Sequence, residues 1–440
     1  MPSNVENLGT LERRVSMTLP AADIERQIDA RLKQLARNVR MPGFRPGKVP
    51  MKLVAQTYGP QVRSEVLGDA VQKSFSDAVK EANLRVAGYP RIEKKEKAAG
   101  EAASSPDLLE FSATFEVYPE IRLGDIGAAA IERPAVTVDD AAVDKTIEIL
   151  RKQRTRFVPA SRPAQAGDRL TVDFQGSIDG QPFEGGKAEN FVFELGGGRM
   201  LPEFESAASG LSEGGTKEFS LKFPDDYHGK DVAGKQAAFQ LTLKKLEQPE
   251  LPALDAEFAK SLGVADGDVT KMRAEVRGNV EREVAKRIEA RVKAQALQAL
   301  LDSTPLELPK SLIDMEAQQL VERAAADLQA RGIKPEQMPL GPSAFADTAK
   351  RRVALGLLIG ELARAENLQP KPAEVRALVE REAASYESPA EVVKWFYMQP
   401  QRLAEMEGVA LEANVVKWVL AKAKVTDKPV SFDELMGGAA

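Results

Sequence analysis

The sequence predicts a multidomain α+β protein with an N-terminal α+β region, an antiparallel β-sheet domain in the middle and an all-α C-terminal region. Its 440 residues are about three times the roughly 150 of a typical domain, and 43% of them are hydrophobic, which is enough for several cores. The spacing of apolar residues also changes along the chain. Up to about residue 119, helix-like and strand-like spacings both occur. From about 167 to 247 apolar residues alternate as in strands, and after residue 252 they recur with the period of a helix.

The N-terminal region combines helices with a strand. Apolar residues at 24–39 share one helical face, and the Met-Pro-Gly sequence at 41–43 ends this helix. A second helix is predicted at about 62–79. The sequence LEFSATFEV at 109–117 alternates as a strand does, and the Ser- and Ala-rich stretch at 98–106 before it is typical of a loop.

A linker at residues 120–160 leads to the sheet domain at 161–247. Thr137-Val138-Asp139-Asp140 resembles a helix N-terminal cap and predicts a helix to about residue 156. So short a helix needs a packing partner, and the sequence leaves open whether it docks on another region. Apolar alternation near residues 170–174, 219–223 and 239–243, separated by many Gly and Pro residues, predicts an antiparallel sheet with tight turns.

Residues 248–440 are predicted to be almost wholly helical, with prolines at the helix boundaries. The predicted helices are 269–301, 310–330, 344–366, 373–385, 390–398 and 402–424. Apolar side chains spread wider than one stripe on several of them, for example at Met315, Leu320, Val321 and Leu328. Such a distribution fits either a closed bundle or helices with exposed apolar surface.

Composition excludes most familiar catalytic machinery. The chain has no cysteine and a single histidine, His228, which excludes thiol nucleophiles, disulfides and sites with cysteine or paired histidine ligands, so we expect neither a metal nor a cofactor. The net charge of −5 does not indicate a dedicated nucleic-acid binder. No secretory signal is visible, and the longest apolar run, 353–360, is too short to span a bilayer, so we expect a cytoplasmic protein without a membrane partner.

The sequence GFRPGKVP at residues 43–50 predicts a rigid basic loop between the first two helices. Its two glycines permit unusual backbone angles and its two prolines stiffen it, so Phe44 and Arg45 are expected at the tip. Residues 31–52 contain seven basic and no acidic side chains, and residues 1–60 carry a net charge of +5. The loop therefore favours a phosphate-rich or acidic partner, and an ordinary turn on a solvated basic surface is the alternative.

The loop resembles the G-F-R-x-G-x-x-P signature of the trigger factor family of bacterial ribosome-associated chaperones, and MKLVAQTYG at 51–59 extends the match. The matching positions are Gly43, Phe44, Arg45, Gly47 and Pro50. Pro46 stands where this family commonly has a basic residue, and Lys48 follows two residues later. The resemblance implies that these seven residues dock on the large ribosomal subunit, against an exit-tunnel protein and nearby rRNA.

Residues 168–247 resemble the FKBP type of peptidyl-prolyl isomerase through VDFQGSIDG at 172–180, FEGG at 183–186, FVFELG at 191–196, MLPEFE at 200–205, FPDDYH at 223–228 and FQLTL at 239–243. The resemblance implies an FKBP-like antiparallel sheet with a short helix. It also implies a pocket made by Phe174, Phe183, Glu184, Phe191, Met200, Leu201, Phe204, Tyr227 and Phe239, with His228 at its rim. Phe174 lacks the tyrosine hydroxyl of small ligand-binding relatives, and Glu203 replaces a customary glycine.

Prolyl isomerisation fits this composition because it needs no nucleophile or metal. Rotation about the amide bond meets a barrier of about 18–20 kcal/mol, which a dry pocket lowers by binding the twisted amide more tightly than the planar one. The alternative is that the rings only fill a core, and we expect that role for Phe193, Phe219 and Phe223. His228 could equally be a surface residue without a role. The glycine-containing stretches 180–188 and 196–198 do not match phosphate-binding loops, so no nucleotide is expected.

Three stretches, 251–264, 349–362 and 419–436, also resemble the trigger factor family, so the similarity covers essentially the whole chain. It implies a ribosome-binding domain at 1–119, a linker at 120–160 packed on the C-terminal body, an isomerase domain at 161–247 and a helical chaperone domain with arms at 248–440. It further implies an ATP-independent chaperone that binds nascent and unfolded polypeptides at the exit tunnel, isomerises prolyl bonds, forms a homodimer off the ribosome and has a link to cell division. The alternatives are a stand-alone prolyl isomerase, a pure holdase with a weakened pocket and, least favoured, an RNA-binding regulator.

Overall fold

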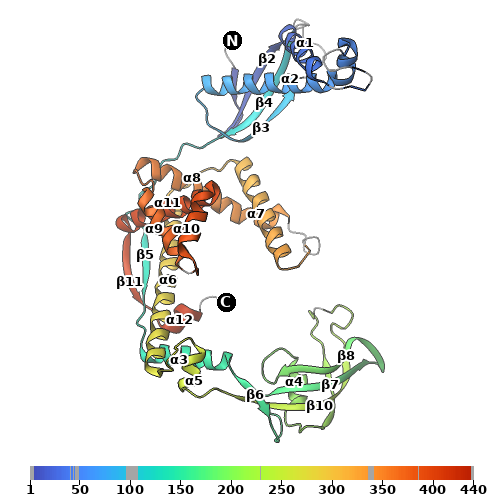
Figure 1. Cartoon of the computed structure of the whole chain (residues 1–440), viewed down its shortest axis with the longest axis vertical. Coiled ribbons are helices and arrows are strands. Elements are labelled where there is room, and N and C mark those ends of the chain that lie inside the picture. The colour runs from blue at the N-terminus through green and yellow to red at the C-terminus, as the bar shows by residue number, and fades with distance from the viewer. Residues whose placement is uncertain are drawn as a thin grey trace. The chain divides into compact units, whose positions relative to one another are not determined.

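The computed structural model describes residues 4–39, 41–42, 44, 49–95, 108–227, 229–334, 341–384 and 386–437. The chain divides into two compact units, which are described separately below. One unit contains residues 1–133 and 291–427, and the other contains residues 134–290 and 428–440. Figure 1 shows the elements of both units, and the long helix α6, Val269–Ser303, belongs to both.

The N-terminal part of the first unit is an antiparallel sheet with the strand order β1-β2-β4-β3 and two helices. The strands are β1 Asn4–Asn7, β2 Glu12–Pro20, β3 Val86–Lys94 and β4 Leu108–Val117, and the helices are α1 Ala21–Asn38 and α2 Met51–Glu81. One core packs the second half of α2 on the sheet, and another packs α1 on the first half of α2. The predicted face of α1 is buried at Ile24, Ile28 and Leu32.

Helix α2 begins at Met51, well before the predicted start near residue 62, and contains Pro60. A proline inside a helix removes one backbone hydrogen bond. Here the first turns of α2 bury Val54 against α1, and Pro60 faces solvent. Packing on α1 therefore outweighs the break that the proline predicts. The loop predicted at 98–106 lies outside the described residues.

The remaining helices of the first unit are α7 Lys310–Ala330, α8 Ala346–Ala365, α9 Pro372–Ala383, α10 Pro389–Met398 and α11 Pro400–Lys422, with a 3₁₀ turn, η2, at Pro342–Phe345. Together with α6, these bounds confirm the predicted helices to within two residues at each end. Helix α7 packs on α8 through Ala317, Leu320 and Ala349. Strands β5 Ala130–Ala135 and β11 Lys424–Pro429 form a two-stranded sheet.

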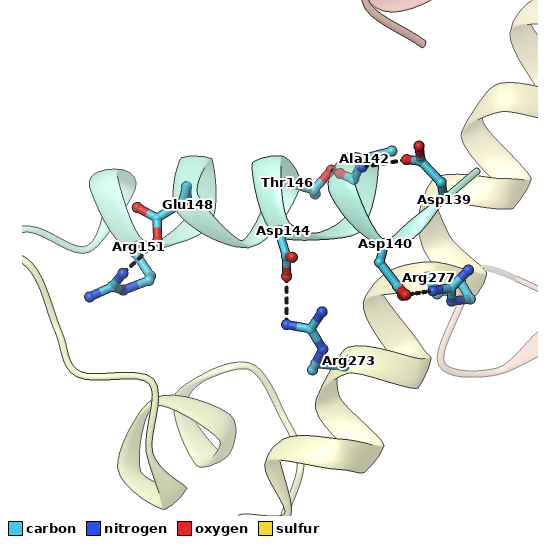
Figure 2. A network of polar contacts seen from close by, with 9 residues as sticks. All are labelled: Asp139, Asp140, Ala142, Asp144, Thr146, Glu148, Arg151, Arg273 and Arg277. Carbon is cyan, nitrogen blue, oxygen red and sulfur yellow. Dashed lines mark hydrogen bonds and ion pairs between the residues drawn. The ribbon is translucent and has the colours of Figure 1, made fainter. Parts of the chain in front are cut away.

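Helix α3, Asp140–Gln153, crosses the N-terminal part of α6 in the second unit (Figure 2). Val143 and Ile147 share one apolar core with Met272 and Val276 of α6. The short helices α5 Ala256–Ser261 and α12 Phe432–Gly437 complete this core. The linker helix is therefore packed rather than free.

A capping hydrogen bond starts α3, and two ion pairs connect it to α6 (Figure 2). Asp139 caps the helix, because its side chain accepts the N–H of Ala142 at 2.9 Å. Asp144 pairs with Arg273 at 2.6 Å. One turn earlier, Asp140 pairs with Arg277.

The rest of the second unit is an antiparallel sheet with the strand order β6-β10-β7-β8, in which β9 also pairs with β10. The strands are β6 Arg156–Pro159, β7 Arg169–Ile178, β8 Gln181–Glu194, β9 Thr216–Lys222 and β10 Gln236–Glu250. The short helix α4, Pro202–Ala208, buries Phe204, Ala207 and Ala208 in the core of this sheet. The predicted antiparallel sheet with a short helix is confirmed.

Candidate functional sites

The core of this sheet domain is built from phenylalanine rings. Phe204 of α4 lies edge-on to Phe174 of β7, with ring centroids 5.3 Å apart, and its centroid is 5.8 Å from that of Phe193 of β8. The ring of Phe239 of β10 lies 6.1 Å from those of both Phe174 and Phe204. Aromatic pairs in such geometries contribute about 0.5–1.5 kcal/mol each beyond the burial of their area. The rings therefore form one mutually supported cluster between α4 and the sheet.

Two glycines make room for these rings. Gly176 of β7 pairs in register with Phe239, and a Cβ atom at Gly176 would lie 2.5 Å from Cε1 of the Phe239 ring. A Cβ atom at Gly186 would likewise lie 2.9 Å from the ring of Phe183. Both distances are far below ordinary carbon contacts. The sequence shows both glycines but not which ring each of them accommodates.

The predicted pocket residues differ in exposure. Phe204 and Phe239 are buried, and the residues that are half-buried against the same core are Phe174, Phe183, Met200, Leu201 and Tyr227. Phe191 lies at the edge of the cluster, where its ring is edge-on to Phe174 at 5.7 Å and its side chain is 36% exposed. Glu184 is exposed on β8, and His228 lies outside the described residues. The structure thus gathers the predicted apolar residues around one cluster and places Glu184 at the surface.

The three phenylalanines predicted to be core residues also join this cluster. Phe193 and Phe223 are buried, which confirms that prediction. Phe219 is half-buried and stacks on Phe239 with centroids 5.8 Å apart. The ring centroids of Phe223 and Tyr227 are 4.9 Å apart, so the core is continuous with the predicted pocket.

A cavity of about 540 Å³ opens on the same sheet, lined by residues 175–177 of β7, 218–220 of β9 and 238–240 of β10. Of the predicted pocket residues, its lining includes Phe239 alone. The cavity therefore does not coincide with the predicted site, which is marked by the contacts between rings.

An ion pair between the half-buried Arg162 and the buried Asp168 holds the chain just before β7. Asp168 is 1% exposed and accepts two hydrogen bonds from Arg162, at 2.7 and 2.8 Å, and one from the N–H of Gln165 at 2.8 Å. Burial alone would raise the pKa of Asp168, but the hydrogen bonds from Arg162 and Gln165 outweigh burial and hold that pKa below its ordinary value. This pair was not predicted, although its members lie only six residues apart.

Of the predicted ribosome-binding loop, the structure describes Phe44 and Pro50, and both are exposed. The other predicted positions, Gly43, Arg45, Pro46, Gly47 and Lys48, lie outside the described residues. The N–H of Phe44 donates to the carbonyl oxygen of Met41 at 3.1 Å, and its side chain is 41% exposed. Val49, which was not predicted, is buried between α1 and α2 and so anchors the end of the loop.

Acidic side chains neutralise part of the positive charge around this loop. Arg31 of α1 pairs with Glu65 of α2 at 2.6 Å, and Arg63 of α2 pairs with Glu25 of α1 at 2.7 Å. Among the basic side chains at residues 31–52 that the structure describes, Arg31 is therefore engaged by an acidic residue distant in sequence. Both pairs are exposed and contribute little to stability.

The helical part of the first unit exposes apolar side chains. The exposed ones include Met315 of α7 and Trp395, Tyr397 and Met398 of α10. A cavity of about 810 Å³ lies between α7, α8 and the segment 118–121, with Leu312, Val353 and Leu357 among its apolar lining residues. Of the four residues that raised the question of a closed bundle or an exposed apolar surface, Met315 is exposed, Val321 and Leu328 are half-buried and Leu320 is buried, so both arrangements stay predictions.

Within the described residues, no helix is long and apolar enough to cross a membrane, and no group of three or more acidic or histidine side chains is suited to hold a metal ion.

Comparison with known proteins matches each region to a described family. Residues 1–150 match the family described as bacterial trigger factor protein (TF), residues 268–421 match its C-terminus, and residues 160–244 match FKBP-type peptidyl-prolyl cis-trans isomerase. A protein named trigger factor from Aromatoleum aromaticum is 56% identical over 440 residues, which cover all of both chains. The chain belongs to the trigger factor family. Trigger factors from Azoarcus sp. and Nitrosospira multiformis are 56% and 55% identical, over 98% and 99% of this chain and 97% and 100% of theirs.

As a trigger factor, the chain is a chaperone with an FKBP-type peptidyl-prolyl isomerase domain, as the sequence predicted. The isomerase match spans the sheet domain that holds the ring cluster. Membership of the trigger factor family implies binding to ribosomes and to nascent chains.

Proposed function

We propose that the ring cluster is the prolyl isomerase pocket, with Phe191 at its rim and Phe174, Phe204 and Phe239 behind it. The observation that carries this proposal is the continuity between the exposed edge of Phe191 and the buried rings. The proposed site also includes Phe183, Glu184, Met200, Leu201, Tyr227 and His228.

The physical reason is the nature of the barrier. Twisting an X-Pro bond breaks amide resonance, at a cost of about 18–20 kcal/mol, and the twisted amide is less dipolar than the planar one. An apolar wall of fixed rings excludes water and so favours the twisted amide over the planar amide. Neither a nucleophile nor a cofactor is required.

The test is the isomerisation of a proline-containing tetrapeptide by full-length variants. Phe191→Ala and Tyr227→Ala should each lower kcat/KM by about tenfold or more, because the wall of the pocket is lost. Suppression of aggregation of an unfolded protein should stay at the wild-type level. Val192→Ala is the matched control, since Val192 is the next residue of β8 and is 53% exposed. Equal kcat/KM for Phe191→Ala and Val192→Ala would refute the proposed pocket.

We propose further that the loop at residues 43–50 docks on the large ribosomal subunit, against an exit-tunnel protein and nearby rRNA. The exposed ring of Phe44, whose backbone N–H is bonded to Met41, supports this role. Replacing Phe44, Arg45 and Pro46 with Ala should abolish cosedimentation with 70S ribosomes. Leu8→Ala is the control because Leu8 is as exposed as Phe44, at 41%, and lies in the same sheet-and-helix region. Unchanged cosedimentation of the loop variant would exclude this docking site.

We infer that the protein works in the cytoplasm and that its regions divide the function between them. Residues 1–119 bind the ribosome, residues 120–160 form the linker, residues 161–247 isomerise prolyl bonds, and residues 248–440 hold unfolded polypeptides. The packing of α3 on α6 supports the proposed role of the linker. We also infer that the free chain forms a homodimer off the ribosome. Sedimentation equilibrium tests the homodimer, and a single monomeric species at micromolar concentration would contradict it.

A further inference from the structure

Asp173 of β7 lies opposite a bulge in β8 that immediately precedes Phe191. Val172 pairs with Phe191 and Phe174 pairs with Ala188, so Glu189 and Asn190 together face Asp173 alone. Asn190 has a φ of +55°, in the left-handed region that asparagine adopts more readily than most residues other than glycine. The backbone direction at this bulge sets where the ring of Phe191 lies.

The carboxylate of Asp173 ties this bulge to two other strands. Its Oδ1 accepts the backbone N–H of Asn190 at 2.7 Å, and its Oδ2 lies 3.0 Å from Nζ of Lys244 on β10. Lys244 in turn donates to Oδ1 of the Asn190 side chain at 3.1 Å. Lys244 itself sits at a register shift of β10, between Leu243 and Lys245. One carboxylate therefore connects irregularities in two strands that flank β7.

The charge state of Asp173 suits this role. The Asn190 N–H and then Lys244 hold the pKa of Asp173 below its ordinary value. Lys187 of β8 also faces the carboxylate, and it pairs with Glu189 at 3.0 Å. Asp173 is ionised at neutral pH, and both of its oxygens are engaged by partners.

We propose that Asp173 is a positioning residue for prolyl isomerisation. It fixes the bulge at Asn190 and thereby holds the Phe191 ring edge-on to Phe174 at the pocket rim. This inference rests on the proposed pocket. Without the carboxylate, the left-handed backbone of Asn190 loses the hydrogen bond that offsets its strain, and the ring of Phe191 is no longer held in one place.

The experiment compares full-length Asp173→Ala, Asp173→Asn and Glu189→Gln by kcat/KM for a proline-containing tetrapeptide. Asp173→Ala should lose about tenfold, because a pocket wall is displaced. Asp173→Asn keeps an oxygen that accepts the Asn190 N–H, so it should stay within about threefold of wild type. Glu189→Gln changes the charge of the same bulge without touching that N–H, and it should match wild type.

A spectroscopic readout separates positioning from general stability. The Phe191 ring protons, shifted by the neighbouring Phe174 ring, should move toward random-coil values in Asp173→Ala, and the Asn190 amide should exchange faster with solvent. The Asp173→Asn variant should restore both signals, so the test stands even if Asp173→Ala folds poorly.

The outcomes distinguish the two proposals. Wild-type kcat/KM in Asp173→Ala, alongside a loss in Phe191→Ala, would overturn the positioning role alone. Equal losses in Asp173→Ala and Glu189→Gln would overturn it as a nonspecific charge effect. Full activity in Phe191→Ala would overturn the pocket and the positioning role together.

Discussion

Replacing Gly176 with alanine should destabilise the isomerase domain because the new methyl group overlaps the Phe239 ring. Its Cβ would lie 2.5, 2.7 and 2.9 Å from Cε1, Cζ and Cδ1 of that ring. Carbon atoms in contact are normally about 3.5–4.0 Å apart, so the ring would need to move by about 1 Å. The ring is only 6% exposed and is enclosed by the rings of Phe174, Phe204 and Phe219, which leave it little room to move.

The magnitude follows from two opposing contributions. Overpacking an ordered core costs about 1–3 kcal/mol. Replacing glycine by alanine in a strand returns about 0.5–1 kcal/mol, because the unfolded chain loses conformational freedom. The expected net destabilisation is therefore about 1–2 kcal/mol, which corresponds to an increase of about 5–30-fold in the open population. Isomerase activity should fall as well, because Phe239 backs the proposed pocket.

Amide hydrogen exchange of the full-length chain measures this effect locally. Both tryptophans, Trp395 and Trp418, belong to the first unit, so tryptophan fluorescence does not report on the isomerase domain. Peptides from β7 and β10 should exchange about 5–30-fold faster in Gly176→Ala. In a Phe239→Leu background, which removes the two most closely overlapping ring atoms, Cε1 and Cζ, the same change should cost less than about 0.5 kcal/mol. A cost that persists in that background would show that the overlap is not the cause.

Two further predictions concern buried or shielded carboxylates. Asp168→Ala should destabilise the isomerase domain by about 1–3 kcal/mol, since it removes the carboxylate partner of Arg162 and leaves the buried N–H of Gln165 without its acceptor. Unchanged amide exchange at the start of β7 would contradict this. Glu116 accepts the backbone N–H groups of Lys310 and Ser311, at 2.9 and 2.7 Å, at the first turn of α7. Burial raises the pKa of Glu116, but the hydrogen bonds from Ser311 and Lys310 outweigh burial and hold the pKa below its ordinary value. The stability that Glu116 contributes is therefore present above about pH 5 and is lost as the pH falls through its lowered pKa. Glu116→Gln should make amide hydrogen exchange in α7 less sensitive to acid. The same dependence of exchange on pH in Glu116→Gln and wild type would refute this role.

Local signals explain why so much of the fold could be predicted from the sequence. Prolines stand at the start of α9, α10 and α11, where a missing N–H costs nothing, and their positions gave these helix boundaries to within two residues. Asp139 gave the start of α3 through its capping pattern. The start of α2 was missed because the penalty of Pro60 is local, whereas the packing that overcomes it comes from α1.

The candidate pocket was predicted as a list of residues, without the contacts between them. The family blocks named Phe174, Phe191 and Phe239, but the pairing of Gly176 with Phe239 depends on the register between β7 and β10. The contact of Asp173 with Asn190 depends on a bulge in a third strand, and register is not encoded in any short stretch of sequence. The local sequence signal for this bulge is the asparagine itself, because asparagine tolerates the positive φ that position 190 has.

The division of labour in the isomerase domain accounts for its composition. The proposed isomerisation depends on apolar rings and needs no cysteine nucleophile or histidine base, so it is compatible with a chain that has no cysteine and one histidine. Rings alone do not fix a backbone, however, because dispersion contacts have no direction. Directional bonds supply what the rings lack, from Arg162 and Gln165 to Asp168 at the entry of β7 and from Asn190 and Lys244 to Asp173 at the bulge. On the proposed role of Asp173, a charged residue outside the pocket holds a ring at its rim, so its substitution should change isomerase activity by moving that ring while every apolar residue of the pocket is kept.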